Sequence, residues 1–296
     1  MKTRDLSKVH QVIGDLFPRP ERIKDWEPYK LSVEQIEHFE EFGYVADIKL
    51  LEEYQISALR EELNELADAH HPGNDLFYEF SANESTDPAK VLFHALGAWR
   101  ITPGFHDVLW NPRFLVPASQ LLGNKAVRFW HDQLFCKPAR HGGVVAWHQD
   151  YSYWTRSVPM QHLTCWCGLD DADEANGCLH YIPKSHRWGL LEKPELAGDI
   201  NGLFTRLTDE QKSLFKPVPI PLKAGYASFH HPLLVHGSYA NSTGRQRRAF
   251  VINAFADGTR SNANEPMLKG TKQFNIGEKL EGDFYPLLFE PSQMGA

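Results

Sequence analysis

The order of apolar and polar residues predicts helices in the first part of the chain. Ser32-Val33-Glu34-Gln35 forms a capping box, after which apolar residues recur at helical spacing as far as Phe42. Gly43 predicts the end of that helix, because glycine readily adopts the conformation that closes one. A short strand is expected over residues 45–48 and a second helix over residues 51–69.

The segments around these elements show weaker patterns. Residues 1–30 combine mixed charge with prolines, which predicts an irregular arm packed on the surface. Residues 70–90 are polar and predict a surface loop. Residues 91–122 predict helical pieces that are interrupted by prolines.

From residue 126 onward, short runs rich in β-branched and aromatic residues alternate with turn residues, which predicts a β-sandwich or barrel. The expected strands cover residues 126–137, 162–169, 178–183, 217–221, 225–230 and 248–256. Asn176-Gly177 indicates a tight turn, and a helix is expected near residues 208–215. We expect a single domain over residues 1–296, made of an irregular arm (1–30), a mostly helical layer (31–125), a β core (126–256) with an insertion (190–216), and a tail (257–296).

Composition narrows the range of functions. The net charge of −7 argues against nucleic-acid binding, which usually needs a basic excess. No apolar stretch is long enough to span a membrane, and the first residues lack the apolar run of a secretory signal. The cysteines lie in apolar or strand-like surroundings, so we expect buried thiols and a cytoplasmic location; they are Cys136, Cys165, Cys167 and Cys178. The oligomeric state stays open.

Two separated motifs carry candidate metal ligands. Within Trp147-His148-Gln149-Asp150, the side chains of His148 and Asp150 would point the same way if the segment is extended. Much later in the chain, His236 ends an apolar run before Gly237-Ser238. Two imidazoles and one carboxylate form the facial triad of non-haem iron(II) oxygenases. The alternative for His148 is a hydrogen-bonded core histidine, and for Asp150 a turn cap.

Two other histidines compete for the role of third ligand. His230 and His231 precede His236 in the same apolar run. His231 is followed by Pro232, which restricts its conformation. We prefer His236, because the turn that follows it leaves room for a ligand.

Arg247 is the candidate anchor for a co-substrate. It follows His236 by eleven residues and would return beside the site on the next strand. Its planar guanidinium can grip a carboxylate through two parallel hydrogen bonds, which suits the distal carboxylate of 2-oxoglutarate. Arg245 is the second choice, and a surface charge within Arg245-Gln246-Arg247-Arg248 is the structural alternative.

With these motifs in place, the chain resembles the phytanoyl-CoA dioxygenase family of iron(II)/2-oxoglutarate oxygenases. The resemblance spans most of the chain. It includes the helix-Gly-Tyr pattern of residues 31–44, Trp147-His148-Gln149-Asp150, residues 163–171, residues 176–186, and His236-Gly237-Ser238 with Arg247. The stretch from Asn176-Gly177 to Pro183-Lys184-Ser185-His186 is its most specific part. Lys184 stands where the family often has glycine.

The resemblance implies a mainly β protein with α-helices, whose core is a double-stranded β-helix (jelly-roll) with N-terminal helices packed on one sheet. It assigns iron(II) to His148, Asp150 and His236 as the catalytic and metal-binding residues. It assigns the 2-oxoglutarate site to Arg247, Ser238, Trp166, Gln133 and Trp130.

The resemblance also implies an oxygenase that uses O2 and 2-oxoglutarate to hydroxylate an unactivated C–H bond of a small molecule, with release of succinate and CO2. Because related halogenases lack the carboxylate ligand, Asp150 favours hydroxylation. The alternatives are a non-catalytic ligand-binding jelly-roll, a cupin-like isomerase, a carbohydrate-binding β-sandwich, or desaturation, cyclisation or halogenation at the same iron. Candidate substrate contacts flank the motifs: Tyr151, Tyr153, Trp154, Arg156, His162 and Trp188.

Overall fold

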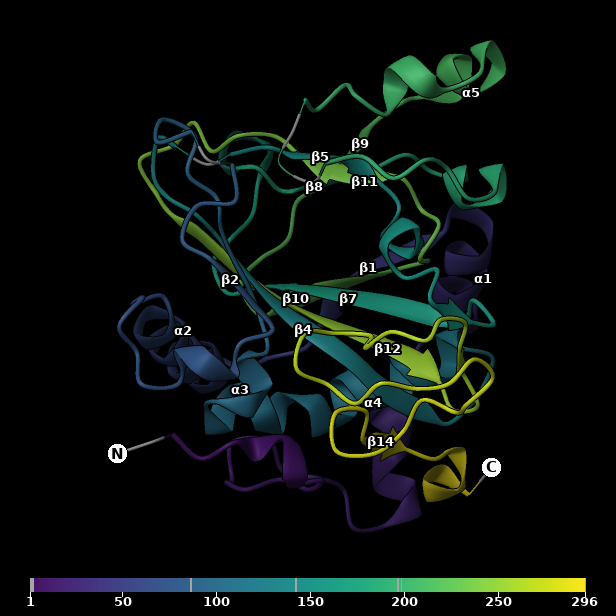
Figure 1. Cartoon of the computed structure of the whole chain (residues 1–296). Helices are drawn as coiled ribbons and strands as arrows, with labels where there is room; N and C mark the ends of the chain where they lie inside the picture. Colours follow the sequence, from purple (N-terminus) through teal and green to yellow (C-terminus); the bar gives the residue numbers. More distant parts are fainter. Residues whose placement is uncertain (1–2, 86, 142, 196, 198, 296) are drawn as a thin grey trace.

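The computed structural model describes residues 3–85, 87–141, 143–195, 197 and 199–295. Among these residues, two antiparallel sheets face each other, and helices cover the outer side of the larger sheet (Figure 1). This is the jelly-roll core with helices on one sheet that the resemblance implied, so the fold prediction is confirmed. The expected division of the chain into one domain with five parts stays a prediction.

Within the described residues, the larger sheet has eight strands in the order β1-β10-β7-β12-β4-β3-β2, with β14 also paired to β4. Its strands are β1 Tyr44–Lys49, β2 Glu79–Ser81, β3 Phe93–Leu96, β4 Val127–Lys137, β7 His162–Gly168, β10 Tyr226–His230, β12 Arg247–Ala256 and β14 Leu287–Phe289. The smaller sheet, in the order β5-β11-β8-β9, consists of β5 Val145–His148, β11 His236–Ser238, β8 Leu179–Tyr181 and β9 Val218–Ile220. The short strands β6 Ser157–Val158 and β13 Arg260–Ser261 pair with each other.

Side chains along the strands of the larger sheet alternate between the hydrophobic core under the helices and the space between the two sheets. In β12, Phe250 and Ile252 join the core beneath the helices, whereas Arg247 and Val251 line a cavity between the sheets. Successive side chains of a strand point to opposite faces, so this split follows from the sequence. Neighbouring strands also turn polar and aromatic side chains into that cavity: Gln133 and Phe135 from β4, Thr164 and Trp166 from β7, and His230 from β10.

The α-helices are α1 Val33–Phe42, α2 Glu53–Leu66, α3 Pro103–Asp107, α4 Pro112–Leu121 and α5 Asp209–Leu214. Figure 1 shows α2, α3 and α4 on the side of the larger sheet that faces away from the smaller one. Phe105 of α3 packs edge-on against Phe250 with ring centroids 6.0 Å apart. Phe114 of α4 stacks on Phe229 at 6.2 Å. Burial of such large rings stabilises the contact between helices and sheet.

The predicted first helix is confirmed. Ser32 caps α1 by accepting a hydrogen bond from the backbone N–H of Gln35, and the Gln35 side chain completes the capping box. Gly43 follows the helix with φ of 87°, a left-handed conformation that glycine adopts without strain. The predicted strand and second helix correspond to β1 and α2, and the helix near residues 208–215 is α5.

Three strands of the larger sheet were not predicted. β2 lies in residues 70–90, which were expected to form a loop, β3 lies in residues 91–122, which were expected to be helical, and β14 lies in the tail over residues 257–296. The remainder of residues 91–122 does contain α3 and α4. The arm over residues 1–30 has the 3-10 turns Leu6–Lys8 and Ile23–Tyr29 and is tied to the core by buried Phe17 and Trp26.

No helix within the described ranges is both long enough and apolar enough to cross a membrane. The cysteines are free thiols, as expected. Cys165, Cys167 and Cys178 are buried, and Cys136 is partly buried.

Candidate active site

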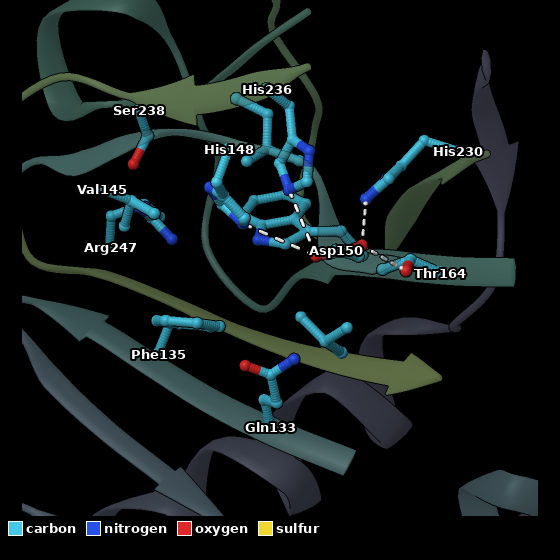
Figure 2. A pocket seen from close by; sticks show the side chains of 13 residues that line it. Gln133, Phe135, Val145, His148, Asp150, Thr164, His230, His236, Ser238 and Arg247 are labelled. Carbon is cyan, nitrogen blue, oxygen red and sulfur yellow. Dashed lines mark hydrogen bonds and ion pairs between the residues drawn. The ribbon is translucent and has the colours of Figure 1, made fainter. Parts of the chain in front are cut away.

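The three predicted metal ligands converge between the two sheets (Figure 2). His148 is the last residue of β5, and His236 is the first residue of β11. These strands pair antiparallel, and His148 lies directly opposite His236 in their register. The sheet pairing therefore brings together two histidines that are distant in the sequence. Asp150 reaches the same point from the segment after β5.

The donor atoms of these residues lie close enough to hold one ion. One ligand atom from each of His148, Asp150 and His236 lies within 4.8 Å of the other two. Asp150 Oδ1 is 3.5 Å from His148 Nε2 and 3.7 Å from His236 Nε2. All three side chains are buried. The set has the two imidazoles and one carboxylate of a facial triad.

The hydrogen bonds of the two histidines leave one nitrogen of each ring free for a metal. His148 Nδ1 donates to the carbonyl of Ala146 at 2.7 Å, and His236 Nδ1 donates to the carbonyl of Leu234 at 3.0 Å. Such bonds fix the ring and direct Nε2 toward the ion. Burial, assisted by the nearby His148, lowers the pKa of His236 well below its usual range, which keeps the imidazole neutral and able to bind a metal.

Asp150 is held as a carboxylate. Burial alone would raise its pKa, but the surrounding His236, His148 and His230 outweigh this effect and hold the pKa well below its usual range. The segment is extended only as far as His148: β5 ends there, and Asp150 begins a 3-10 turn, Asp150–Tyr153. The turn still presents the carboxylate to His148.

The two competing histidines have different positions. His230 lies in β10, and its Nε2 contacts Asp150 Oδ2 at 3.0 Å, on the side of the carboxylate away from His148 and His236 (Figure 2). His231 packs near Phe39 and His186, outside the cluster that could hold a metal. The apolar run forms two strands, β10 and β11, and His231 lies in the segment between them.

Arg247 lies in the same cavity, as the sequence predicted. Its side chain is 2% exposed and stacks over the ring of Trp166, with 5.4 Å from the guanidinium carbon to the ring centroid. One terminal nitrogen donates to the carbonyl of Gly177 at 3.1 Å, while Nε has no partner among the described residues. Burial lowers the pKa of Arg247 to about 10, so the group remains a cation at neutral pH. Arg245, the second choice, is exposed and pairs with Asp173.

Ser238 and Arg247 both present unused hydrogen-bonding capacity in this cavity. The buried hydroxyl of Ser238 also lacks a partner within the described part of the chain. A buried polar group without a partner is costly, and two of them lining one cavity indicate a polar ligand. A carboxylate would satisfy both, and the paired donors of an arginine suit it well. The residues therefore fit 2-oxoglutarate next to an ion at the triad.

Gly177 contributes to the position of Arg247. It adopts a left-handed conformation with φ of 81° in the turn that Asn176-Gly177 predicted. A Cβ atom at this position would collide with the carbonyl oxygen of Tyr239. Only glycine can therefore bring this turn, and the carbonyl that accepts from Arg247, so close to the end of β11.

The remaining predicted co-substrate contacts divide between two cavities. Trp166 and Gln133 line the cavity of Arg247 and Ser238, which we call the co-substrate pocket. Gln133 accepts a hydrogen bond from His94 at 2.9 Å. Trp130 does not line that pocket; it lines a second cavity on the other side of the triad. Its predicted contact with the co-substrate stays a prediction, although its position favours contact with a substrate.

The second cavity, which we call the substrate chamber, has a volume of about 920 Å³. His148, Asp150 and Gln133 line both cavities, so the two meet at the triad. Charged and aromatic side chains surround the chamber: Glu79, Glu84, Glu195, Glu265, Arg156, Lys193, Lys269, Trp130, His131, Tyr153 and Trp154. Of the substrate contacts considered from the sequence, Tyr153, Trp154 and Arg156 belong to it, and Tyr151, His162 and Trp188 do not line it.

Sequence reasoning missed several residues that line the two cavities. Thr164 donates to Asp150 Oδ2 at 2.6 Å, yet it resembles an ordinary strand threonine in the sequence. His131 lies between the predicted contacts Trp130 and Gln133 but was not singled out, and Glu84 lies far from any motif. A signal did exist for Thr164, because it is two residues before Trp166 and therefore shares its face of β7.

Comparisons with known proteins agree with this geometry. Residues 39–249, more than half of the chain, match the family described as "Phytanoyl-CoA dioxygenase (PhyH)". The chain belongs to the phytanoyl-CoA dioxygenase family. Together with the triad, this membership makes the protein an oxygenase that depends on iron(II), 2-oxoglutarate and O2.

Individual members of the phytanoyl-CoA dioxygenase family are distant relatives. A probable phytanoyl-CoA dioxygenase of Caenorhabditis elegans is 25% identical over 263 residues, which cover 84% of this chain and 82% of the relative. A methylphosphonate hydroxylase of Gimesia maris is 27% identical over 235 residues, covering 77% and 83%. Among solved structures, the non-haem, alpha-ketoglutarate-dependent carbocyclase SnoK from nogalamycin biosynthesis superposes with a TM-score of 0.69 at 21% identity, covering 92% of this chain and 100% of SnoK. This last likeness concerns the fold.

Proposed function

We propose that this protein hydroxylates an unactivated C–H bond of a small molecule, with His148, Asp150 and His236 as the iron ligands. The observation that carries the proposal is the junction of two cavities at the triad. One cavity has the donors for a dicarboxylate, and the other is large enough for a substrate. When iron(II) and 2-oxoglutarate are bound, O2 would oxidise 2-oxoglutarate to succinate and CO2, which takes up one oxygen atom, and the second oxygen atom would be available to hydroxylate the C–H bond.

In this proposal the co-substrate pocket orients 2-oxoglutarate. Arg247 and Ser238 bind its distal carboxylate through the atoms that have no protein partner. Trp166 supports the guanidinium from one side, and Gln133 lies where the pocket opens toward the chamber. Arg247 and Ser238 are buried, and burial strengthens charged hydrogen bonds to them. Trp130 then belongs to the substrate side, although the sequence placed it with the co-substrate.

The chamber also supports a proposal about the substrate. Its volume of about 920 Å³ is at the upper end of cavities that bind small molecules, and greatly exceeds the size of methylphosphonate. Aromatic rings line the chamber together with acidic and basic side chains. Tyr153 illustrates the first group, since its ring meets that of His148 edge-on at 5.9 Å. We therefore expect a larger substrate with an apolar or aromatic part at the iron and a polar remainder.

Retention of Asp150 supports an oxygenating outcome. A carboxylate ligand occupies the position that chloride takes in related halogenases, so hydroxylation is favoured over halogenation. The likeness to a hydroxylase and to a carbocyclase leaves cyclisation as the competing outcome to test.

The test is a screen for succinate release with iron(II), 2-oxoglutarate and O2. Candidate substrates should include acyl-CoA thioesters, amino-acid derivatives and aromatic polyketides. A true substrate should raise succinate release and gain one oxygen atom, as measured by mass spectrometry, whereas cyclisation would remove two hydrogen atoms. The Asp150→Ala variant is the control for iron chemistry. Absence of a visible absorption band on anaerobic addition of iron(II) and 2-oxoglutarate would reject the proposal.

A further inference from the structure

The two oxygens of the Asp150 carboxylate have different surroundings (Figure 2). Oδ1 faces the Nε2 atoms of His148 and His236 at 3.5 and 3.7 Å. Oδ2 instead lies 2.6 Å from Thr164 Oγ1 and 3.0 Å from His230 Nε2. One oxygen is therefore directed at the metal position, and the other is engaged by protein groups.

The directions of these hydrogen bonds follow from chemistry. A carboxylate only accepts, so Thr164 Oγ1 and His230 Nε2 both donate to Oδ2. The other ring nitrogen of His230 is 3.0 Å from the hydroxyl of Tyr181, which in turn is 2.8 Å from Ser228 Oγ. In the neutral imidazole this nitrogen accepts from Tyr181, and Tyr181 accepts from Ser228. The result is a chain of donors that runs from Ser228 to Asp150.

This chain, which we call the Asp150 relay, is built into both sheets. His230 and Thr164 lie directly opposite each other in the register of β10 and β7. Tyr181 comes from β8 of the smaller sheet, where it pairs with His236. His230, Tyr181 and Ser228 are all buried at 1% exposure or less. Regular strands thus fix every member, and water does not compete for the bonds.

We propose that His230 is a positioning residue that keeps Asp150 bound to the metal through Oδ1 alone, with Tyr181 and Ser228 fixing the donor direction of His230. This inference rests on the proposed function, because it concerns the iron site. A carboxylate that binds through one oxygen occupies one coordination position, whereas a chelating carboxylate occupies two. Engagement of Oδ2 therefore preserves a position that 2-oxoglutarate or O2 requires.

The test compares His230→Leu, which removes one of the two donors to Oδ2 and leaves Thr164, with His230→Gln, whose amide can still donate to Oδ2. Binding of Co(II) alone is followed by its visible d–d spectrum, and binding of 2-oxoglutarate to the iron(II) protein is followed anaerobically. We expect His230→Leu to weaken 2-oxoglutarate binding by roughly 10- to 100-fold and to change the cobalt spectrum, because Oδ2, then held by Thr164 alone, can turn more readily toward the metal. His230→Gln should largely restore both properties.

Tyr181→Phe provides a second, milder variant, since it removes only the hydroxyl that fixes His230. We expect a several-fold weaker 2-oxoglutarate affinity with an intermediate cobalt spectrum. If His230→Leu does not fold, as judged by circular dichroism, an unchanged affinity and spectrum in folded Tyr181→Phe would overturn the inference. Unchanged values in folded His230→Leu would overturn it directly.

The two proposals fail in different ways. Wild-type protein that binds neither Co(II) nor 2-oxoglutarate would refute the proposed function. Wild-type protein that binds both, with His230→Leu identical to it, would refute only the role of the relay.

Discussion

The co-substrate pocket and the substrate chamber meet at one triad but are built differently. Most of the co-substrate pocket consists of inward-facing side chains of the two sheets, such as Phe135, Trp166, Ser238 and Arg247. Much of the chamber consists of turns and loops, including residues 193–195 and 265–269. Sheets hold side chains rigidly, whereas loops tolerate change. We infer that the two sheets hold the iron ligands and the co-substrate contacts in place, whereas the loops determine which substrate binds.

The two cavities also differ in charge. The co-substrate pocket has the buried cation of Arg247, for which no acidic partner lies within 4.0 Å among the described residues. In the chamber, acidic and basic side chains are mixed and several are already engaged: Arg156 approaches Glu265 at 3.5 Å, and Glu84 approaches His94 at 3.5 Å. The first cavity is ready for an anion, and the second suits a molecule of mixed polarity.

The largest effect should follow from breaking the triad that both cavities share. We expect Asp150→Ala and His236→Ala each to lower turnover by at least about a thousandfold and to abolish stoichiometric iron(II) binding. The three ligands act as a unit, so the loss of any one of them should remove most of the activity. Metal analysis and succinate release measure the two properties. His231→Asn is the matched control, because His231 lies outside the cluster. Its loss of iron would contradict the assignment of His236.

The next largest effect should be confined to the co-substrate pocket. Arg247→Leu should raise the KM for 2-oxoglutarate by roughly 100-fold, because a buried charge-assisted pair with a carboxylate is lost. Iron binding should persist, since Arg247 does not contact the triad. Arg245→Leu removes the neighbouring exposed arginine and should change the KM little. Equal effects of the two variants would contradict a specific carboxylate site.

On the co-substrate side, the sequence placed Arg247 beside the triad because it follows His236 by eleven residues and was expected on the returning strand. The face on which it lies was not visible, because Phe250, Val251 and Ile252 are consecutive apolar residues and every residue of β12 is buried. The pairing of His148 with His236 was not visible, because register between distant strands depends on the whole sheet. The resemblance to a family supplied that link.

The chamber side was less predictable. Strand β3 contains Phe93, His94 and Leu96, all buried, so it lacks the alternation that identifies a strand exposed on one face. Glu84 and Lys193 lie in irregular segments whose path no local pattern dictates. Trp130 was assigned to the co-substrate from family position, but strand β4 directs it into the chamber.

Two buried histidines that pack against Trp130 should make stability depend on pH. Burial lowers the pKa of His131 to about 4 and that of His162, which packs against Trp130, to about 3. Both imidazoles have a pKa of about 6.5 in the unfolded chain, so the unfolded state binds more protons between these values. Stability is therefore complete above about pH 6.5 and falls as the pH decreases toward the folded-state values.

The size of this effect can be measured on the metal-free protein. Between about pH 7.5 and about pH 4.5, His162 alone should lower the free energy of unfolding by about 3 kcal/mol, because the roughly two pH units below its unfolded-state pKa each contribute about 1.36 kcal/mol. His162→Leu should remove that part of the pH dependence, as measured by urea unfolding at both pH values. A variant with the wild-type dependence would show that His162 is not held neutral.

The smallest expected effect is a change in substrate binding that leaves 2-oxoglutarate binding unchanged. The hydroxyl of Tyr153 donates to the carbonyl of Pro194 at 2.8 Å and so ties the loop that contains Lys193 to the turn beside the triad. Tyr153→Phe removes this bond, worth about 1 kcal/mol, and should raise the KM for the substrate about 3- to 10-fold. The KM for 2-oxoglutarate should not change, because Tyr153 does not line the co-substrate pocket. Tyr54→Phe, at an exposed tyrosine of α2, is the matched control. If the KM values for the substrate and for 2-oxoglutarate rise together, the loop of the chamber affects both cavities. The inference that the sheets bind the co-substrate and the loops determine substrate binding would then be wrong.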